Sequence, residues 1–434
     1  MPFYGGLPKR SNLDDLLQPD VFLWATGIED TFITDPSKRT GRILDEYELT
    51  GHYDRWREDL DLMASLGVSA ARYGIPWYRV QPSPDRWDWT WPDQTFDHMM
   101  KRGVEPIVDL VHYGVPSWLE GGLLDHDYPS RMAEYGARVA ERYRGRIRWY
   151  TPLNEPRINA WYSGMIGWWP PYRRGWKGFA QVLFSIARAV SLTHRALKEV
   201  DPEITCVHVD PADLYFTRDP SLEQETAFRQ ELVFLALDLI SGRVDSKHPL
   251  WSWLVDQGIS ELQLGEMARL AVEPDIIGIN CYPLFGWKEV VPSGGRVVTR
   301  NRYASGELLE MLAKMYWERY DRPLMITETA SMGRRRLQWL EQSVDAVRRL
   351  RGAGVPVIGY TWWPMFSIVG WAYRQSSRDL AEHMVHLGLW DLDANLNRME
   401  TPVAGAYRNV VSGGAASVGL LKRSSQRRET VAVS

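Results

Sequence analysis

HYDRWREDLDLMASLGVSAAR, residues 52–72, holds in one stretch the two elements from which the rest of the chain is built. Residues 53–66 have the apolar spacing of an amphipathic helix, and residues 68–72 form a short apolar run typical of a strand. Short apolar runs and longer amphipathic segments alternate in this way along most of the chain. The sequence therefore predicts repeated pairs of a strand and a helix.

Eight such pairs can be assigned. The predicted strands are residues 21–26, 68–72, 105–111, 147–153, 204–209, 275–280, 324–328 and 357–362. The predicted helices are 53–66, 92–102, 131–143, 179–200, 222–239, 258–270, 306–318, 337–351 and 402–411. Because strands that alternate with helices run parallel, and no glycine-rich dinucleotide motif follows the first strand, we predict an α/β fold, a closed (β/α)8 barrel. A large doubly wound sheet is the alternative.

The barrel is expected to be a single domain over residues 21–411, with an N-terminal extension (1–20) and a disordered tail (412–434), because the periodic pattern stops there. No apolar stretch reaches the roughly 18 residues that a membrane span needs. A net charge of −4 gives no electrostatic reason to expect nucleic acid or an anionic membrane as a partner. We expect a soluble, cytoplasmic protein whose cysteines, Cys206 and Cys281, are buried free thiols.

Tryptophan is unusually frequent, with 21 residues among 434. The aromatic rings could simply fill a large core. They could also line a sugar-binding cleft, because the apolar face of a pyranose ring stacks on an aromatic plane. Composition alone does not separate these two interpretations.

Two glutamates stand where predicted strands end. The fourth strand runs into Thr-Pro-Leu-Asn-Glu-Pro, which ends at Pro156, and the seventh runs into Ile-Thr-Glu-Thr-Ala, which ends at Ala330. Reactive groups of such barrels lie at the C-terminal strand ends, so Glu155 and Glu328 should face each other across the barrel mouth. Cleavage of a glycoside needs such a pair, one carboxyl protonated and the other ionised. A structural ion pair is the alternative for either residue alone.

An ordered series of motifs surrounds these two residues. It comprises FLW (22–24), the stretch 52–72, WYRVQP (77–82), HYGVPSWL (112–119), NEP (154–156), GINCY (278–282), HLGLWD (386–391) and AYR (406–408). In this order the series resembles the β-glucosidase family of retaining glycosidases, glycoside hydrolase family 1, over about residues 21–411. The resemblance implies a TIM barrel that acts on a β-linked glycoside through a covalent glycosyl-enzyme intermediate.

The resemblance also implies roles for individual residues. Glu155 would be the general acid/base and Glu328 the nucleophile. The supporting residues would be Arg72 beside the nucleophile, Asn154 on the sugar 2-hydroxyl, Tyr282 on the nucleophile, Asn280 as support and His112 on sugar hydroxyls. A lone histidine at a strand end could instead be structural or bind metal, but no HExxH or CxxC motif accompanies it. No metal or cofactor is therefore predicted, and the expected partner is a small-molecule glycoside or oligosaccharide.

The chain departs from the family pattern around the sugar. The expected threonine before the Asn-Glu pair is Pro152, and the expected Thr-Glu-Asn-Gly continues after Glu328 as Thr329-Ala330. The first-strand loop carries Glu29 where the family has glutamine, and residues 362–371 replace an acidic Glu-Trp pair with an apolar, aromatic segment. We expect Glu29 to bind sugar hydroxyls; alternatively it pairs with an arginine while Asp30 caps a turn.

Three activities remain open at this point. The first is hydrolysis of a β-glycoside with retention. A transglycosidase would use the same intermediate with an acceptor hydroxyl in place of water, which Trp118, Trp168 and Trp169 near the mouth would favour. A sugar-binding barrel without turnover is the third, although it would gain nothing from an ionised nucleophile.

Overall fold

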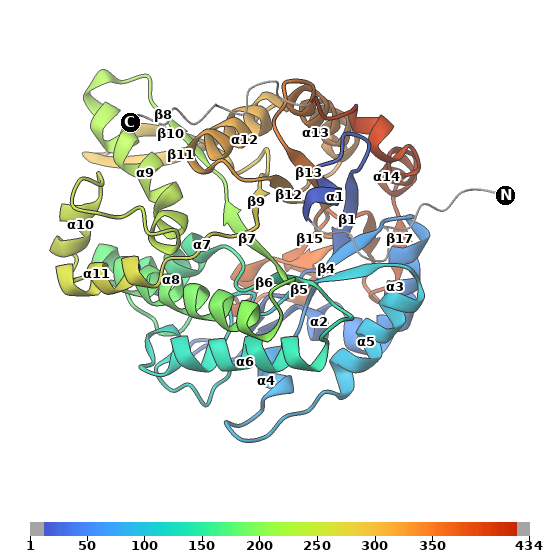
Figure 1. The fold of residues 1–434 in the computed structure, drawn as a ribbon, viewed down its shortest axis with the longest axis horizontal. Helices are drawn as coiled ribbons and strands as arrows, with labels where there is room; N and C mark the ends of the chain where they lie inside the picture. Colours follow the sequence, from blue (N-terminus) through green and yellow to red (C-terminus); the bar gives the residue numbers. More distant parts are fainter. Residues whose placement is uncertain (1–12, 423–434) are drawn as a thin grey trace, which may run out of the picture.

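A computed structural model describes residues 13–422 and contains a closed barrel of eight parallel strands (Figure 1). In spatial order the strands are β1 (Leu23–Gly27), β13 (Val357–Trp362), β12 (Leu324–Thr329), β9 (Ile276–Asn280), β7 (Thr205–Pro211), β6 (Trp149–Thr151), β5 (Glu105–Asp109) and β4 (Ala70–Gly74). The barrel closes because β1 pairs with both β13 and β4. The predicted (β/α)8 barrel is confirmed, and the doubly wound alternative is wrong.

A ring of helices surrounds the strands (Figure 1). Its members are α3 (His52–Ser65), α5 (Thr90–Lys101), α6 (Tyr128–Arg142), α8 (Gly175–Val200), α9 (Glu223–Ile240), α11 (Glu261–Arg269), α12 (Glu307–Tyr320), α13 (Arg335–Gly352) and α14 (Pro402–Ser412). These nine helices correspond one by one to those predicted, with ends that differ by a few residues. Most of them bury one apolar face against the strands, which gives the periodic signal, whereas residues 232–240 of α9 are buried in one continuous run.

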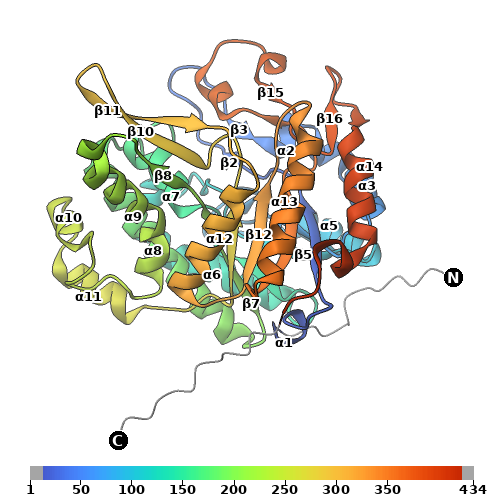
Figure 2. The same cartoon turned by 90° about the horizontal axis from the view of Figure 1, so that it is seen from above.

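The chain also forms elements that the sequence did not predict. A hairpin of β10 (Trp287–Ser293) and β11 (Arg296–Arg302) joins β8 (Leu214–Phe216) in a separate three-stranded sheet. Figure 2 shows this sheet at the end of the molecule opposite α1 (Leu13–Leu16). Most of β11 is exposed, so its residues lack the apolar run or strict alternation that reveals a strand. Short helices in the loops, such as α7 (Pro156–Ala160), were missed because of their length.

Inward-pointing side chains fill the barrel. The cluster that they form consists of Leu23, Ala25, Ala70, Ile107, Trp149, Val207, Val209, Ile276, Met325 and Ile358. Leu16 of α1 packs against this cluster and is fully buried, so residues 13–16 close the N-terminal end of the barrel. The opposite end, where the strands finish, is therefore the open one.

The predicted boundary of the tail is wrong for residues 412–422. Ser412 ends α14, residues 414–418 form a 3-10 helix, and Val418 is fully buried. The buried guanidinium of Arg351 donates hydrogen bonds to the carbonyl oxygens of Pro19 (2.9 Å) and Gly419 (3.0 Å), so polar contacts hold this segment where apolar periodicity gave no signal. Residues 1–12 and 423–434, which include the rest of the predicted extension and tail, lie outside the described residues.

Two further expectations can be compared with the structure. Cys206 and Cys281 are buried free thiols, as predicted. Within residues 13–422, no helix combines the length and the apolar character that crossing a membrane would require.

Candidate active site

Glu155 lies just past the end of β6, at the open end of the barrel. Its backbone adopts a left-handed conformation with φ of 47° and begins α7. A non-glycine residue in this region costs about 1 kcal/mol or more and persists only where the surroundings hold it. Here the amide of Glu155 donates to the carbonyl oxygen of Val209 in the neighbouring β7 (3.1 Å), which fixes the turn that directs the side chain.

The carboxylate of Glu155 is buried among neutral hydrogen-bond donors. Tyr113 donates its hydroxyl hydrogen to Oε2, and Asn280 donates from Nδ2 to Oε1 (2.9 Å). Burial and the negative charge of Glu328 raise the pKa of Glu155 to about 7, and the two hydrogen bonds oppose that rise. Glu155 is thus suited to carry a proton near neutral pH.

Glu328, on β12, has a cation as its neighbour. Arg72 Nη1 donates to Glu328 Oε1 (2.6 Å), and the hydroxyl of Tyr282 donates to Oε2 (2.7 Å). Burial raises the pKa of the Glu328 carboxyl above its ordinary value, while the charges of Arg72 and His112 oppose that rise. The two glutamates therefore differ in one essential respect, because Glu328 forms an ion pair with a buried arginine and Glu155 is held by neutral groups.

Arg72 connects this pair to a wider polar network beneath the site. Its Nη2 donates to Asp109 Oδ2 and to Asn154 Oδ1 (2.8 Å). Burial opposes the charge of Arg72, but the carboxylates of Asp109 and Glu328 outweigh it and raise the pKa of the guanidinium, which therefore stays charged. Asn154 is fully buried, and its amide also donates to Tyr113 (3.1 Å).

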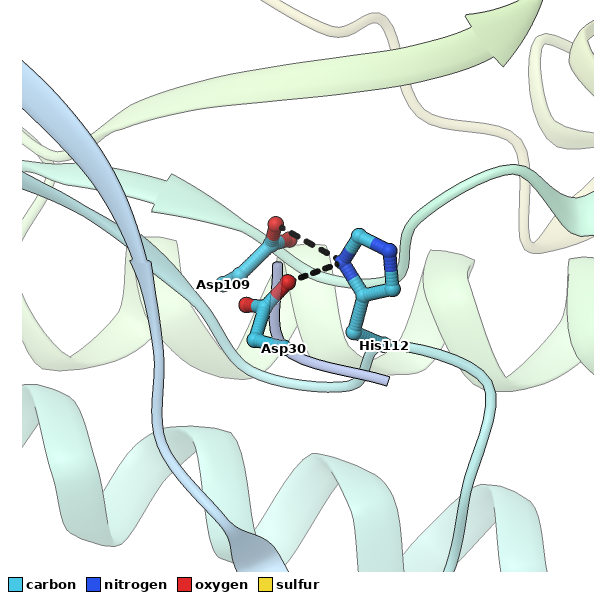
Figure 3. Close-up of side chains that lie close together, drawn as sticks. All are labelled: Asp30, Asp109 and His112. Atoms are coloured by element: carbon cyan, nitrogen blue, oxygen red, sulfur yellow. Dashed lines mark hydrogen bonds and ion pairs between the residues drawn. The ribbon is translucent and has the colours of Figure 1, made fainter. Parts of the chain in front are cut away.

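His112 is held between two carboxylates, as Figure 3 shows. Its Nδ1 lies 2.6 Å from Asp30 Oδ1 and 3.3 Å from Asp109 Oδ2. Burial opposes the charge of His112, but these carboxylates outweigh it and raise the pKa of the imidazole well above its ordinary value. Burial also raises the pKa of Asp30 to about 7. Because both carboxylates contact Nδ1, the Nε2 edge of the ring is directed away from them, toward Asn154 and Glu29.

Two glycines make room for this arrangement. A Cβ atom on Gly74 would lie 2.0 Å from Asp30 Oδ2, and one on Gly27 would lie 2.1 Å from the ring of Trp363. Trp363 in turn stacks on His112, with the ring planes 6° apart. The sequence did not identify Asp109, gave Asp30 only as a possible turn cap, and included Trp363 only within the segment 362–371. The contacts of these residues with His112 join strands that are distant in sequence.

Asp30, Asp109 and His112 are also spaced so that they could hold a metal ion, and so are Glu231, Asp238 and His248. In each group a guanidinium already contacts at least one of the carboxylates. Arg72 Nη2 contacts Asp109, and Arg319 Nη2 contacts both Glu231 (3.1 Å) and Asp238 (2.5 Å). A metal ion would have to displace these arginines, so the donor sets fit cation–carboxylate networks better than metal sites.

Glu29 follows β1 and lines the same cavity as Glu155, which follows β6 on the other side of the barrel. Thr31 donates to Glu29 Oε1 (2.5 Å) and Trp363 Nε1 donates to Glu29 Oε2 (3.1 Å). Among residues 13–422, no arginine forms an ion pair with Glu29, so that alternative is wrong. Asp30 likewise contacts His112 instead of capping a turn.

A cavity of about 700 Å³ opens above the two glutamates. Six of the eight residues singled out in the sequence line it: Glu29, His112, Glu155, Asn280, Tyr282 and Glu328. Arg72 and Asn154 lie behind this wall, fully buried. The lining also contains residues that the sequence did not single out, among them Tyr113, Arg157 and Lys288. Of the three tryptophans suggested to lie near the mouth, Trp168 lines the cavity.

The comparisons with known proteins agree with this geometry. Residues 25–330 match the family described as glycosyl hydrolase family 1. The chain belongs to this family. The resemblance noted from the sequence is thereby confirmed, and this family 1 member is a glycoside hydrolase of the β-glucosidase type.

Two of its relatives in this family are each about a quarter identical to it. A bifunctional β-D-glucosidase/β-D-fucosidase of Bifidobacterium breve is 24% identical over 411 residues, covering 78% of this chain and 87% of the relative. β-Glucosidase A of Thermotoga maritima is 24% identical over 364 residues, covering 75% and 80%. A structure of a Thermotoga maritima β-glucosidase with glucoimidazole aligns with a TM-score of 0.80 at 21% identity, covering 93% of this chain and 99% of that one. At this identity the structural match establishes the fold alone.

Proposed function

We propose that the protein hydrolyses a β-glycoside with retention of configuration, with Glu328 as nucleophile and Glu155 as general acid/base. The observation that carries the proposal is the contrast between the two carboxyls in one cavity. Glu328 is paired with Arg72, and the pKa of Glu155 is raised to about 7 among neutral donors. Environments that separate two carboxyls in this way assign one to attack and the other to proton transfer.

The reaction would proceed in two displacements. In the first, the Glu328 carboxylate attacks the anomeric carbon while the carboxyl of Glu155 gives its proton to the glycosidic oxygen, and the aglycone leaves as an alcohol. In the second, ionised Glu155 takes a proton from water, which attacks the anomeric carbon and releases Glu328 as a carboxylate. After both steps Glu155 is again protonated, so the cycle closes without another reactant.

The neighbouring residues would act through these two. Arg72 and Tyr282 hold the Glu328 carboxylate by both oxygens, which orients it and favours its ionised form. Asn280 contacts Glu155 (2.9 Å). Asn154 was expected on the sugar 2-hydroxyl, but its amide is engaged by Arg72 and Tyr113, so a sugar contact would need one of these partners to be exchanged. We therefore propose Asn154 as a positioning residue.

Glu29, which follows β1, and His112, which follows β5, would bind the hydroxyls of the glycone. The carboxylate of Glu29 can accept hydrogen bonds from two vicinal hydroxyls, and charge-assisted hydrogen bonds are about twice as strong as neutral ones. The adjoining wall, from the loop after β13, is apolar and includes Trp363, Pro364, Ile368 and Trp371. This wall favours a glycone without a polar group at C6, such as a 6-deoxy sugar or a pentose. The name of the Bifidobacterium breve relative, which includes β-D-fucosidase, supports this choice.

The stereochemistry of the first product tests the proposal. Aryl β-fucosides, xylosides and glucosides would be screened, and the hydrolysis of the best substrate followed by proton NMR from its first turnovers. The β-anomer of the free sugar is expected first, with the α-anomer appearing only by later mutarotation. Initial release of the α-anomer would contradict direct attack by Glu328.

A further inference from the structure

The cavity wall on the Glu155 side carries an excess of positive charge. Arg157, Arg229 and Lys288 all line the cavity there, and Asp213 is the carboxylate that lines it beside them. They come from α7, α9, β10 and the loop between β7 and β8, on the side of the barrel where the β10–β11 hairpin lies (Figure 2). Glu29, which follows β1 across the barrel from β6, and His112 bind the glycone in the proposed function.

One carboxylate is shared between two of these cations. Arg157 Nη2 and Lys288 Nζ both donate to the same oxygen, Asp213 Oδ2, the latter at 2.7 Å. Arg157, Lys288 and Asp213 therefore carry a formal charge of +1 together. Their side chains are 8%, 18% and 7% exposed, so water screens this charge only in part. Charged groups that are partly buried in this way attract a counter-ion more strongly than surface lysines do, because salt and water screen them less.

Arg229 is a third cation in the lining of the same cavity. Its Nε donates to Glu225 Oε1 (2.7 Å), and its Nη1 donates to Thr299 Oγ1 (3.2 Å) on β11. Glu225 does not line the cavity, whereas Arg229 and Thr299 do. An arriving ligand would thus meet the guanidinium and the hydroxyl, with the balancing carboxylate behind them.

The position of these groups determines which part of a substrate would meet them. A general acid protonates the oxygen of the leaving group, so the aglycone must extend from the reacting carbon toward the Glu155 side. Arg157 follows Glu155 by two residues and is held on the same side by a hydrogen bond to the carbonyl oxygen of Pro211 (2.8 Å). We infer that the aglycone subsite takes a negatively charged group, with Lys288 and Arg229 as the contacting cations. This inference rests on the proposed function for its assignment to the aglycone.

Binding of free aglycones tests the inference without turnover. The probes are 3-(4-hydroxyphenyl)propanoate and its primary amide, which match in shape and differ in charge, and their dissociation constants would be measured by calorimetry. The wild-type protein is expected to bind the acid at least about tenfold more tightly than the amide, a difference of about 1.4 kcal/mol. That preference should weaken as salt is added, because a partly exposed charge is screened.

Variants separate Lys288 from general charge effects. Lys288→Met should reduce the preference for the acid to about threefold or less, and Lys288→Arg should retain it; Asp213 keeps Arg157 as its partner in both. Arg229→Gln, which alters a different element, should also reduce the preference. The matched control is Arg296→Ala, which removes one positive charge from the exposed tip of the same hairpin and should leave the preference unchanged.

The corresponding aryl β-glycosides, made from the same acid and amide, provide the kinetic arm, since their ethylene spacer keeps the two phenols equally good leaving groups. The inference is overturned if the acid binds no more tightly than the amide, and also if neither of them binds. It is likewise overturned if Lys288→Met, shown to be folded by its melting temperature, keeps the full preference for the acid. Failure of both glycosides to turn over, with the acid still preferred in binding, would instead contradict the proposed function and leave the anion site in place.

Discussion

The hydroxyl of Tyr113 should control the pH at which the enzyme loses activity. This hydroxyl donates to Glu155 Oε2, and the hydrogen bond lowers the pKa of Glu155 from the value that burial and Glu328 alone would impose. Tyr113→Phe removes the bond and keeps the aromatic ring that packs on His112 and Trp371. Without this donor the ionised form of Glu155 becomes less favourable, so the pKa of Glu155 must rise.

The size of the shift follows from the strength of the bond. A hydrogen bond to a charged group contributes roughly 1.5–3 kcal/mol, and one pKa unit corresponds to about 1.4 kcal/mol. The basic limb of the kcat/KM profile, which reports the free enzyme, should therefore move up by about one to two units from its wild-type position near pH 7. Since Glu155 and Glu328 titrate as a pair, the shift is assigned to the limb and not to one group alone.

The assay is kcat/KM between pH 4 and 10 on an aryl β-glycoside with a poor leaving group, which depends on protonation by Glu155. The control is Tyr162→Phe, which removes another hydroxyl from the cavity wall. This hydroxyl does not donate to Glu155, whose side-chain donors are Tyr113 and Asn280. Its basic limb should stay in place. An unmoved or lowered basic limb in Tyr113→Phe would refute the reasoning.

Three further predictions concern the same network. Glu155→Gln should make the folded state more stable than that of the wild type, and the gain should grow as pH rises from about 4.5 to 7, to about 3 kcal/mol at most. The reason is that the raised pKa of Glu155 makes its ionisation destabilise the folded wild-type protein. If urea unfolding gave the same difference in unfolding free energy between variant and wild type at pH 5 and pH 8, this would be contradicted. Gly74→Ala would bring a methyl group within 2.0 Å of Asp30 Oδ2 and displace the support of His112, so kcat/KM should fall at least about tenfold, whereas Gly265→Ala, where a Cβ meets nothing within 4 Å, should leave it unchanged. Glu29→Gln should lower kcat/KM on the preferred fucoside or xyloside about tenfold or more, and unchanged kinetics would leave Glu29 as a structural residue.

The sequence predicted the barrel well because its strands and helices are buried on defined faces. Residues 357–362 are fully buried on both faces and appear as one apolar run, so their strand could be assigned to the residue. In the hairpin of β10 and β11, most of β11 is exposed and only two residues of β10 are buried, and the hairpin carries Lys288, Arg296, Arg300 and Arg302. The sequence therefore shows neither an apolar run nor a regular alternation there. The contribution of the hairpin to the cavity wall could thus not be anticipated.

The site was predictable for the carboxylates at strand ends and, through the family resemblance, for the contacts of Arg72 and Tyr282 with Glu328. Contacts across the barrel that the resemblance did not supply could not be predicted. Glu155 and Glu328 stand out as carboxylates at the ends of apolar strands. The contact of Asp30 with His112 depends on the space left by Gly74, on a third strand, and the sequence gives no sign that these three positions adjoin. Asn154 was expected to face the sugar, but hydrogen bonds from Arg72 and to Tyr113 hold it within the protein.

The identity of the nucleophile is tested most directly by trapping the intermediate. A 2-deoxy-2-fluoro β-glycoside of the preferred sugar, with a good leaving group, should react once and add a single fluorosugar to the protein. The fluorine slows both displacements, and the good leaving group restores the rate of the first one alone, so the intermediate accumulates. Mass spectrometry of the digested adduct is predicted to place the sugar on Glu328. A label on Glu155 or on any other residue, or steady hydrolysis with the α-anomer as first product and no adduct, would contradict the central claim.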